Sequence, residues 1–369
     1  MKFKRVLTFS AISILSLGTL VGFTELNKVP VDRTFIIEDV KGDREALKSV
    51  SLESVMKVDN HSFEKVLVTQ DCVRFEDTKF DLMYGVGEEV LNNKDLYRGM
   101  NHALEVKNNV FTLIASFNSY YPYASDEPTL KLAKKDHQTN QVTKETITLP
   151  GFISKQQVSN ESLVEVNDTI YYAIVTQDIS GNTSKPVFRL YEVDSDQLQV
   201  KEIMNQDISL PSDYTDVSEF AEFDGELYAV LSNQKECMLV TIDVATRKIT
   251  KQNLPAFSQE GSYIEKFMID QSYYYLTMDS VITLLDKETH KVKSITDQPS
   301  FLKDYEFVST AEQKINENQL YVIYDAYKQN GPSDSYIVVY SQTSGNTLYE
   351  GKLPSMVNRG IGINYSFTE

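Results

Sequence analysis

The feature of this chain that most constrains its fold is a repeated unit of four short strands. Each unit reads strand, polar turn, strand, variable loop, strand, turn, strand. The second strands start at Val110, Thr169, Glu226, Tyr273 and Gln319, so successive copies are 59, 57, 47 and 46 residues apart. Five copies occupy about residues 99–150, 161–211, 219–255, 264–297 and 308–354. A recurring period of this kind indicates a repeat architecture.

The strands of each copy are rich in Val, Ile, Tyr, Phe and Thr, and Asn, Asp, Gly, Ser and Pro separate them. This is the pattern of strands and turns, and no long helical periodicity follows residue 24. Four-stranded units with a period of about 40–50 residues are typical of β-propeller blades, because each blade buries its faces against its neighbours. The sequence therefore predicts an all-β chain with blades of four strands.

Two segments carry a resemblance to a known class of repeats. Val240–Ile249 and Ile282–Val292 resemble the third strand, turn and fourth strand of quinoprotein-like and surface-layer-type β-propeller repeats. The resemblance covers residues 99–354 as a pattern and implies the fold. The chain has no Trp, whereas quinoprotein repeats place one in each unit. We therefore carry over no chemistry and expect no cofactor.

The number of blades follows from the two ends of the repeat region. Strands are predicted at Val50–Val58, Phe63–Thr69 and Lys79–Gly85 before the first copy, and across Gly360–Phe367 after the last. We expect head and tail to form one further blade, which avoids exposed sheet edges. This gives six blades over residues 50–369, with seven as the alternative and a pair of irregular β-sandwiches as the rival architecture.

The N-terminus has the pattern of a membrane anchor. Lys2, Lys4 and Arg5 precede an uncharged stretch over residues 6–23, which is long enough as a helix to cross a membrane. The basic flank predicts a cytoplasmic tail at 1–5, a single-pass signal-anchor at 6–23, a linker at 24–49 and an extracytoplasmic C-terminal domain. A cleaved signal peptide and a secreted protein are the alternative. The tether and the composition suggest a bacterial surface protein.

Charge and cysteine content narrow the function classes. The formal charge of −17 argues against a nucleic-acid partner, because phosphate binding depends on basic patches. Two cysteines are too few for a disulfide scaffold or a four-thiolate metal site. Outside the cytoplasm, Cys72 and Cys237 either pair or remain separate buried thiols.

Candidate contact residues lie in the loops between second and third strands. These loops have the same topological place in every copy, so we expect them to project from one face of the ring, where function usually resides. The longest combine tyrosines with acids, a mixture suited to contacts that are apolar on one side and wet on the other. The predicted ligand or partner contacts are Tyr120, Tyr121, Tyr123, Asp126, Asp178, Tyr327 and Asp334.

No sequence motif points to catalysis or to a metal. No two of the four histidines have the spacing of metal ligands, and no nucleophile elbow or phosphate loop is present. We therefore predict no catalytic residues and no metal, and a binding, sensing or scaffold module beside another membrane or cell-surface protein. The alternatives are an extracellular polysaccharide hydrolase or lyase and a purely structural envelope element. Two or more close acids in a central funnel would favour the enzyme.

Overall fold

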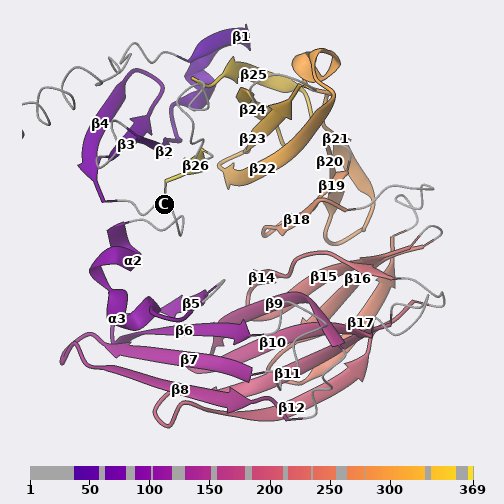
Figure 1. Ribbon diagram of the computed structural model, residues 1–369. Coiled ribbons are helices and arrows are strands. Elements are labelled where there is room, and N and C mark those ends of the chain that lie inside the picture. The colour runs from indigo at the N-terminus through magenta and orange to yellow at the C-terminus, as the bar shows by residue number, and fades with distance from the viewer. Residues whose placement is uncertain are drawn as a thin grey trace, which may run out of the picture.

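Six antiparallel sheets stand in a ring around a common axis (Figure 1). The computed structural model describes residues 37–57, 63–79, 88–100, 103–118, 129–150, 156–178, 185–210, 215–233, 236–254, 264–278, 280–328, 334–354 and 365–368. Each sheet is a blade of a propeller, numbered here in chain order. The prediction of a six-bladed all-β propeller is confirmed.

The first three blades have four strands each, given from the axis outward. Blade 1 contains β26 (Ser366–Phe367), β2 (Leu52–Lys57), β3 (Phe63–Val68) and β4 (Val73–Thr78). Blade 2 contains β5 (Leu104–Lys107), β6 (Phe111–Asn118), β7 (Thr129–Asp136) and β8 (Val142–Thr148). Blade 3 contains β9 (Gln156–Val166), β10 (Thr169–Asp178), β11 (Pro186–Asp194) and β12 (Gln199–Asp207).

The last three blades include two departures from four strands. In blade 4 the inner strand is split into β13 (Asp216–Val217) and β14 (Ala221–Phe223), followed by β15 (Glu226–Ser232), β16 (Cys237–Asp243) and β17 (Lys248–Asn253). Blade 5 contains β18 (Lys266–Ile269), β19 (Tyr273–Met278), β20 (Val281–Asp286) and β21 (Val292–Ile295). Blade 6 contains β22 (Phe307–Asn316), β23 (Gln319–Tyr327), β24 (Asp334–Ser341), β25 (Thr347–Lys352) and, outermost, β1 (Glu38–Gly42).

Both ends of the described chain take part in closing the ring. The last strand, β26, pairs with β2, with Phe367 opposite Leu52, and so supplies the inner strand of blade 1. At the other end, β1 pairs with β25 and adds a fifth strand to blade 6. The expected joining of head and tail is therefore present. Residues 38–42, which the sequence placed in the linker, lie in a sheet because they cover the edge of β25.

Blade 1 differs from the sequence prediction in its outer strand. The strand lies at Val73–Thr78, whereas the sequence predicted it at Lys79–Gly85. Lys79 follows the strand, and residues 80–85 lie outside the described residues. The observed strand alternates half-buried and exposed side chains, which is the pattern of an outer strand with one solvated face.

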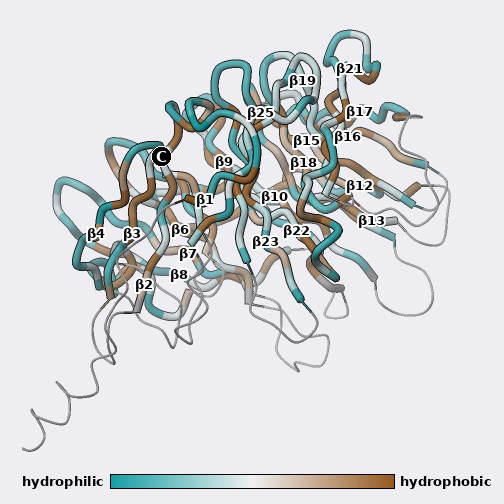
Figure 2. Tube along the Cα trace, turned by 90° about the horizontal axis from the view of Figure 1, so that it is seen from above, coloured by the Kyte–Doolittle hydropathy of each residue, from teal (hydrophilic) through white to brown (hydrophobic). Residues whose placement is uncertain are grey.

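Short polar turns set the register of the hairpins. The turns between third and fourth strands in blades 2–6 place their fifth residue at positive φ: Asn140, Leu198, Arg247, His290 and Gly345. In blade 4 the first residue, Asp243, accepts a hydrogen bond from the Thr246 amide at 2.8 Å. The Thr246 hydroxyl and amide lower the pKa of Asp243. These turns stand on the upper side in Figure 2, where hydrophilic residues gather.

The blades are held together by apolar clusters between neighbouring sheets. Blade 5 shows the principle: Tyr274 packs toward blade 4, while Tyr273 and Tyr275 pack toward blade 6. Successive side chains on a strand point to opposite faces, so the three tyrosines serve two interfaces. Each large apolar side chain buried this way contributes about 1.5–3 kcal/mol.

The seam between blades 1 and 2 is different. Within the described residues, the neighbouring pairs from blade 2 round to blade 1 share an apolar cluster, whereas blades 1 and 2 share none. Two short helices, α2 (Glu88–Asn92) and α3 (Lys94–Tyr97), lie at this seam (Figure 1). Leu96 of α3 packs on Ile114 and Ala133 of blade 2. Two 3₁₀ turns complete the described elements: η1 (Arg44–Leu47) and η3 (Ser300–Asp304).

Two further expectations concern the anchor and the cysteines. None of the helices in the described part of the chain is long and apolar enough to cross a membrane. The expected anchor at residues 6–23 lies outside that part. Cys72 and Cys237 are both free, the first exposed after blade 1's β3 and the second buried in blade 4. The two thiols are therefore separate in this structure.

Candidate functional site

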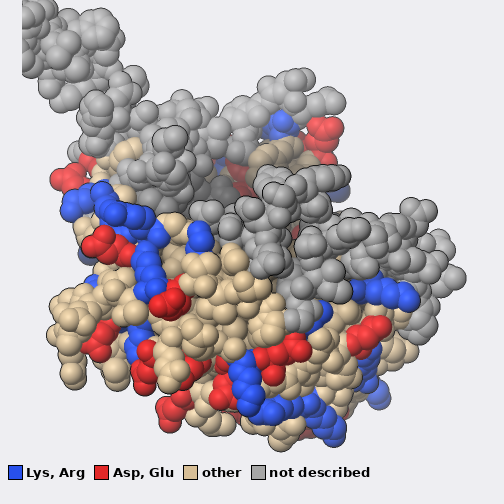
Figure 3. Space-filling model, turned by 60° about the horizontal axis from the view of Figure 1, so that its bottom comes forward, with Lys and Arg blue, Asp and Glu red and all other residues tan. Residues whose placement is uncertain are grey.

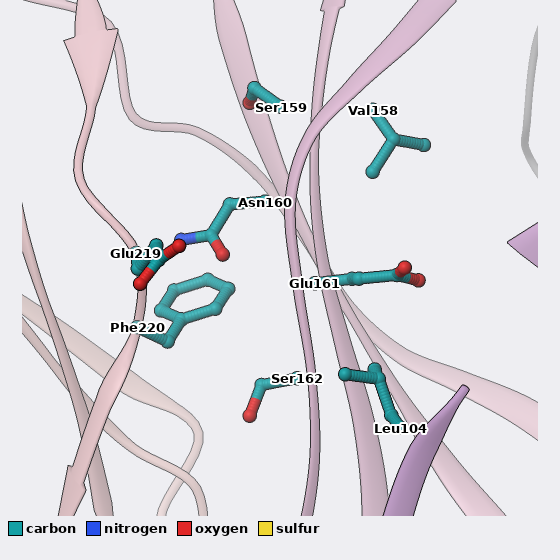
Figure 4. Close-up of a pocket in the computed structure, with 8 residues that line it drawn as sticks. All are labelled: Leu104, Val158, Ser159, Asn160, Glu161, Ser162, Glu219 and Phe220. Carbon is teal, nitrogen blue, oxygen red and sulfur yellow. The ribbon is translucent and has the colours of Figure 1, made fainter. Parts of the chain in front are cut away.

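A recess lies at the axis, where the inner strands of blades 2, 3 and 4 meet. It has a volume of about 440 Å³. The residues that line it are Leu104, Val158, Ser159, Asn160, Glu161, Ser162, Glu219 and Phe220 (Figure 4). Seven of the eight come from two stretches, residues 158–162 of β9 and 219–220 between β13 and β14, and five of these seven are polar. The recess is therefore a site where side chains of neighbouring blades converge.

An irregularity in β9 shapes one wall. In the pairing with β10, Asn160 lies opposite Val175 and Val158 lies opposite Thr176, so Ser159 is an extra residue. Such a bulge bends a strand and changes the direction of its side chains, and bulges are frequent beside active sites. The Ser159 hydroxyl donates to the Val175 carbonyl at 3.3 Å.

A break in the inner strand of blade 4 shapes the opposite wall. Ser218, Glu219 and Phe220 separate β13 from β14. Ser218 is anchored to β15, because its amide donates to the Val230 carbonyl and its hydroxyl accepts from the Val230 amide, both at 2.9 Å. The buried Asn160 amide donates to the Ser218 carbonyl at 2.6 Å. One hydrogen bond thus links the irregular segments of two blades.

Two carboxylates flank β9 in the recess. Glu161 lies on the side of Leu104, and Glu219 lies near Asn160 and Phe220 on the other side (Figure 4). The Tyr172 hydroxyl donates to Glu161 Oε2 at 2.6 Å. None of the described residues that line the recess is basic. The recess therefore favours a ligand that is neutral or cationic and rich in hydrogen-bond donors.

Of the predicted loop contacts, the structure describes the side chains of two. Tyr327, at the end of β23, is 41% exposed and stands beside Phe307, which is 58% exposed, with ring centroids 5.9 Å apart. Tyr120, Tyr121, Tyr123 and Asp126 lie outside the described residues, and for Asp178 only the backbone is described. The contact role of these residues stays a prediction.

Asp334 was predicted as a loop contact and instead is 8% exposed. Its Oδ2 accepts from the Tyr305 hydroxyl at 2.5 Å and forms an ion pair with Lys352 at 3.0 Å. The Tyr305 hydroxyl also contacts the Tyr336 hydroxyl at 2.7 Å. Burial, followed by the bond to Asp334, raises the pKa of Tyr305. Asp334 is the first residue of β24, so its carboxylate does not project from the loop. It links Tyr305 and Lys352 within blade 6.

The described residues contain no group of three or more His, Cys, Asp and Glu side chains that could hold a metal ion. His137 and His290 both occupy hairpin turns, in blades 2 and 5. The arrangement at the axis supports hydrogen bonding and, through its two glutamates, acid–base chemistry.

The recess was missed at the sequence level. In the copy at 161–211 the apolar residues of the first strand lie at Leu163–Val166, whereas β9 begins at Gln156. The stretch Gln157–Ser162 is polar and lacks apolar alternation. The available signal was the length of the connection: residues 151–162 form a stretch of twelve, more than a turn requires.

Comparisons with known proteins agree with the fold. Protein-family models and curated protein sequences gave no match. Among solved structures, a cobalt-substituted apocarotenoid oxygenase from Synechocystis is 12% identical, with 90% of this chain and 95% of that chain covered and a TM-score of 0.50. At this identity the likeness shows the propeller fold alone.

Two further solved structures are more distant. The Dos1 propeller is 10% identical, and its alignment covers 81% of this chain and 68% of the Dos1 chain, with a TM-score of 0.45. A family 43 endo-arabinanase from Bacillus licheniformis is 15% identical, covers 68% and 97%, and has a TM-score of 0.35. The ring of six sheets, together with the first of these likenesses, defines the class as the β-propeller, and function has to be argued from the site.

Proposed function

We propose that this protein is a membrane-anchored, extracytoplasmic binding module whose ligand site is the axial recess. The apolar stretch at 6–23 behind a basic flank supports the anchor and the location outside the cytoplasm. The single observation that carries the binding role is the recess itself. Two inner strands depart from regular pairing at the same place, and the Asn160–Ser218 bond fixes them there.

The chemistry of the recess indicates the kind of partner. It offers two carboxylates, an amide and two serine hydroxyls beside Leu104, Val158 and Phe220. Such a surface fits a polypeptide segment with a basic or amide side chain and some apolar area. We therefore favour a segment of a neighbouring membrane or cell-surface protein as the ligand.

Site-specific crosslinking in native membranes tests this proposal. A photoreactive residue at position 219 should capture a partner polypeptide, while the same residue at exposed position 288, in a hairpin turn of blade 5, should not. Ser159→Tyr, which fills the recess from an exposed bulge position, should abolish the first product. Identical products from positions 219 and 288, or a product that persists in Ser159→Tyr, would refute the axial site.

The anchor is tested separately by fractionation. The intact chain should stay with membranes after alkaline carbonate extraction, and a variant lacking residues 6–23 should be released. Release of the intact chain would favour the secreted alternative and would leave the crosslinking result interpretable.

A second candidate function rests on the two glutamates. Glycoside hydrolysis uses a pair of carboxyl groups on either side of the scissile bond, and Glu161 and Glu219 flank the same recess. Release of reducing ends from a polysaccharide panel would support this candidate. Glu161→Gln and Glu219→Gln should then each lose at least 100-fold in rate, while Glu145→Gln on the outer strand of blade 2 should not. If the wild-type protein releases no reducing ends from any polysaccharide of the panel, this second candidate function is refuted.

A further inference from the structure

A second recess, on the other side of blade 2, has the opposite chemistry. It lies between α3 and the hairpin ends of blade 2 and has a volume of about 100 Å³, the space of about three water molecules. Its lining residues are Asn93, Leu96, Tyr97, Lys107, Thr112, Lys135 and His137. Two lysines, a histidine and a threonine hydroxyl therefore surround a space the size of a small ion.

The strand register of blade 2 places Lys107 and Lys135 on the same face of the sheet. Lys107 of β5 pairs with Thr112 of β6, which pairs with Lys135 of β7. Residues paired in this way across strands share a face of the sheet. With neighbouring strands about 4.8 Å apart, the two lysine positions lie about 10 Å from each other, on either side of the threonine.

Hydrogen bonds fix several of the side chains that line this second recess. The Thr112 hydroxyl and His137 Nε2 are 2.9 Å apart. Lys135 Nζ donates to Asn93 Oδ1 at 2.6 Å, next to α3. Leu96 of α3 packs against the same face one row further along. Lys135, Thr112 and His137 are thus held at the recess by Asn93 and by the hairpin turn.

The local charge runs against that of the whole chain. Residues 94–144 contain seven Lys and Arg and five Asp and Glu, a balance of 7 − 5 = +2, whereas the chain carries −17. Basic side chains lie at the left of Figure 3, with acidic ones among them, over the part of the molecule where α3 and the ends of β7 and β8 lie in Figure 1. An anion is attracted to such a site even when the protein is acidic overall.

We infer that this recess binds a phosphate group, either as inorganic phosphate or at the end of a phosphomonoester. Lysine ammonium groups and hydroxyls are donors suited to phosphate oxygens, and charge-assisted hydrogen bonds are the stronger kind. The volume admits an ion of a few heavy atoms and excludes a large ligand. The site is separate from the axial recess, so it stands or falls independently of the binding module proposed above.

Histidine NMR on the full-length protein tests the inference. With ¹³C-labelled histidine, and His137→Gln to identify its signal, sodium phosphate and glycerol 3-phosphate are titrated at constant ionic strength, with sodium chloride as the reference. A saturable shift of the His137 signal with a millimolar or tighter dissociation constant is expected. Saturation by inorganic phosphate alone identifies the free ion, and saturation by both identifies a phosphate end group.

Matched lysine variants separate binding from general charge. Lys107→Gln leaves the Lys135–Asn93 bond in place and should weaken phosphate binding at least tenfold. Lys134→Gln removes the same charge on the opposite face of β7, where Lys134 pairs with Asp196 at 2.7 Å, and should change it less than twofold. An equal response of the two variants, or a His137 shift that chloride reproduces, would overturn the inference.

Discussion

The contact between blades 5 and 6 can be tested at a single glycine. Gly345 ends the hairpin turn of blade 6 at φ +73°, and a Cβ added there would lie 2.1 Å from the Ile295 carbonyl oxygen of blade 5. Its own carbonyl accepts from the Asp297 amide at 3.0 Å, and Asp297 Oδ2 accepts from the Thr347 amide at 3.0 Å. Gly345→Ala therefore has to separate two backbones that touch.

The expected loss of folding free energy in Gly345→Ala is the sum of three contributions. The left-handed conformation costs an alanine about 1 kcal/mol relative to glycine. Displacing the turn weakens the two hydrogen bonds at Asp297, at about 1 kcal/mol each. The sum is about 3 kcal/mol, or about 6 °C in melting temperature at about 2 °C per kcal/mol for a chain of this size. Circular dichroism or scanning calorimetry of the purified protein measures it.

Two control variants isolate the contact from the backbone conformation. Gly225→Ala has the same cost of a left-handed backbone, at φ +76°, but its Cβ would meet only a Val166 side-chain carbon at 3.0 Å. We therefore expect the melting temperature to fall by only about 2 °C. Arg247→Ala changes an exposed residue already at φ +59°, so less than about 1 °C is expected. If Gly345→Ala costs no more than Gly225→Ala, the close approach of the two blades is not what requires glycine.

Three further predictions concern groups elsewhere in the ring. Burial raises the pKa of the Cys237 thiol to about 12, so under native conditions at pH 8 a disulfide reagent should modify the exposed Cys72 and leave Cys237 until the protein is unfolded. Burial also raises the pKa of Asp325 above its usual 3.8, so the ionised form of this side chain destabilises the fold at neutral pH. Asp325→Asn should therefore raise the melting temperature at pH 7. The gain should vanish below about pH 3.8, where the aspartate is protonated in both the folded and the unfolded state. Removal of residues 365–369 deletes the buried Tyr365 and Phe367 and bares β2, so the melting temperature should fall by more than 10 °C, with association visible in light scattering; an unchanged monomer would contradict closure by β26.

The repeat pattern was sufficient for the fold because turn chemistry defines the hairpins. The predicted starts at Thr169, Glu226, Tyr273 and Gln319 coincide with the starts of β10, β15, β19 and β23. Asn-Asp and Asp-Gly pairs precede the first two of these strands, and such residues adopt the positive φ that a tight turn requires. Second and third strands are also apolar on both faces, since each blade packs against two neighbours.

The candidate sites were harder to predict because they depend on inner strands and on burial. Inner strands have one unpaired edge at the axis, so β9 tolerates the polar residues that hid it from a search for apolar alternation. A bulge such as that at Ser159 leaves no composition signal. Asp334 looked like a loop residue because Pro and Gly precede it, but its position at the start of β24 buries it against Tyr305 and Lys352.

The pairing of β26 with β2 has a consequence for biosynthesis. A ribosome makes the chain from its N-terminus, so β2, β3 and β4 emerge roughly three hundred residues before the strand that completes their sheet. During that interval the nascent protein presents an open strand edge next to β2. Molecular chaperones that shield such edges, or rapid docking of blade 6 onto blade 1, would then decide how much of the newly made protein matures.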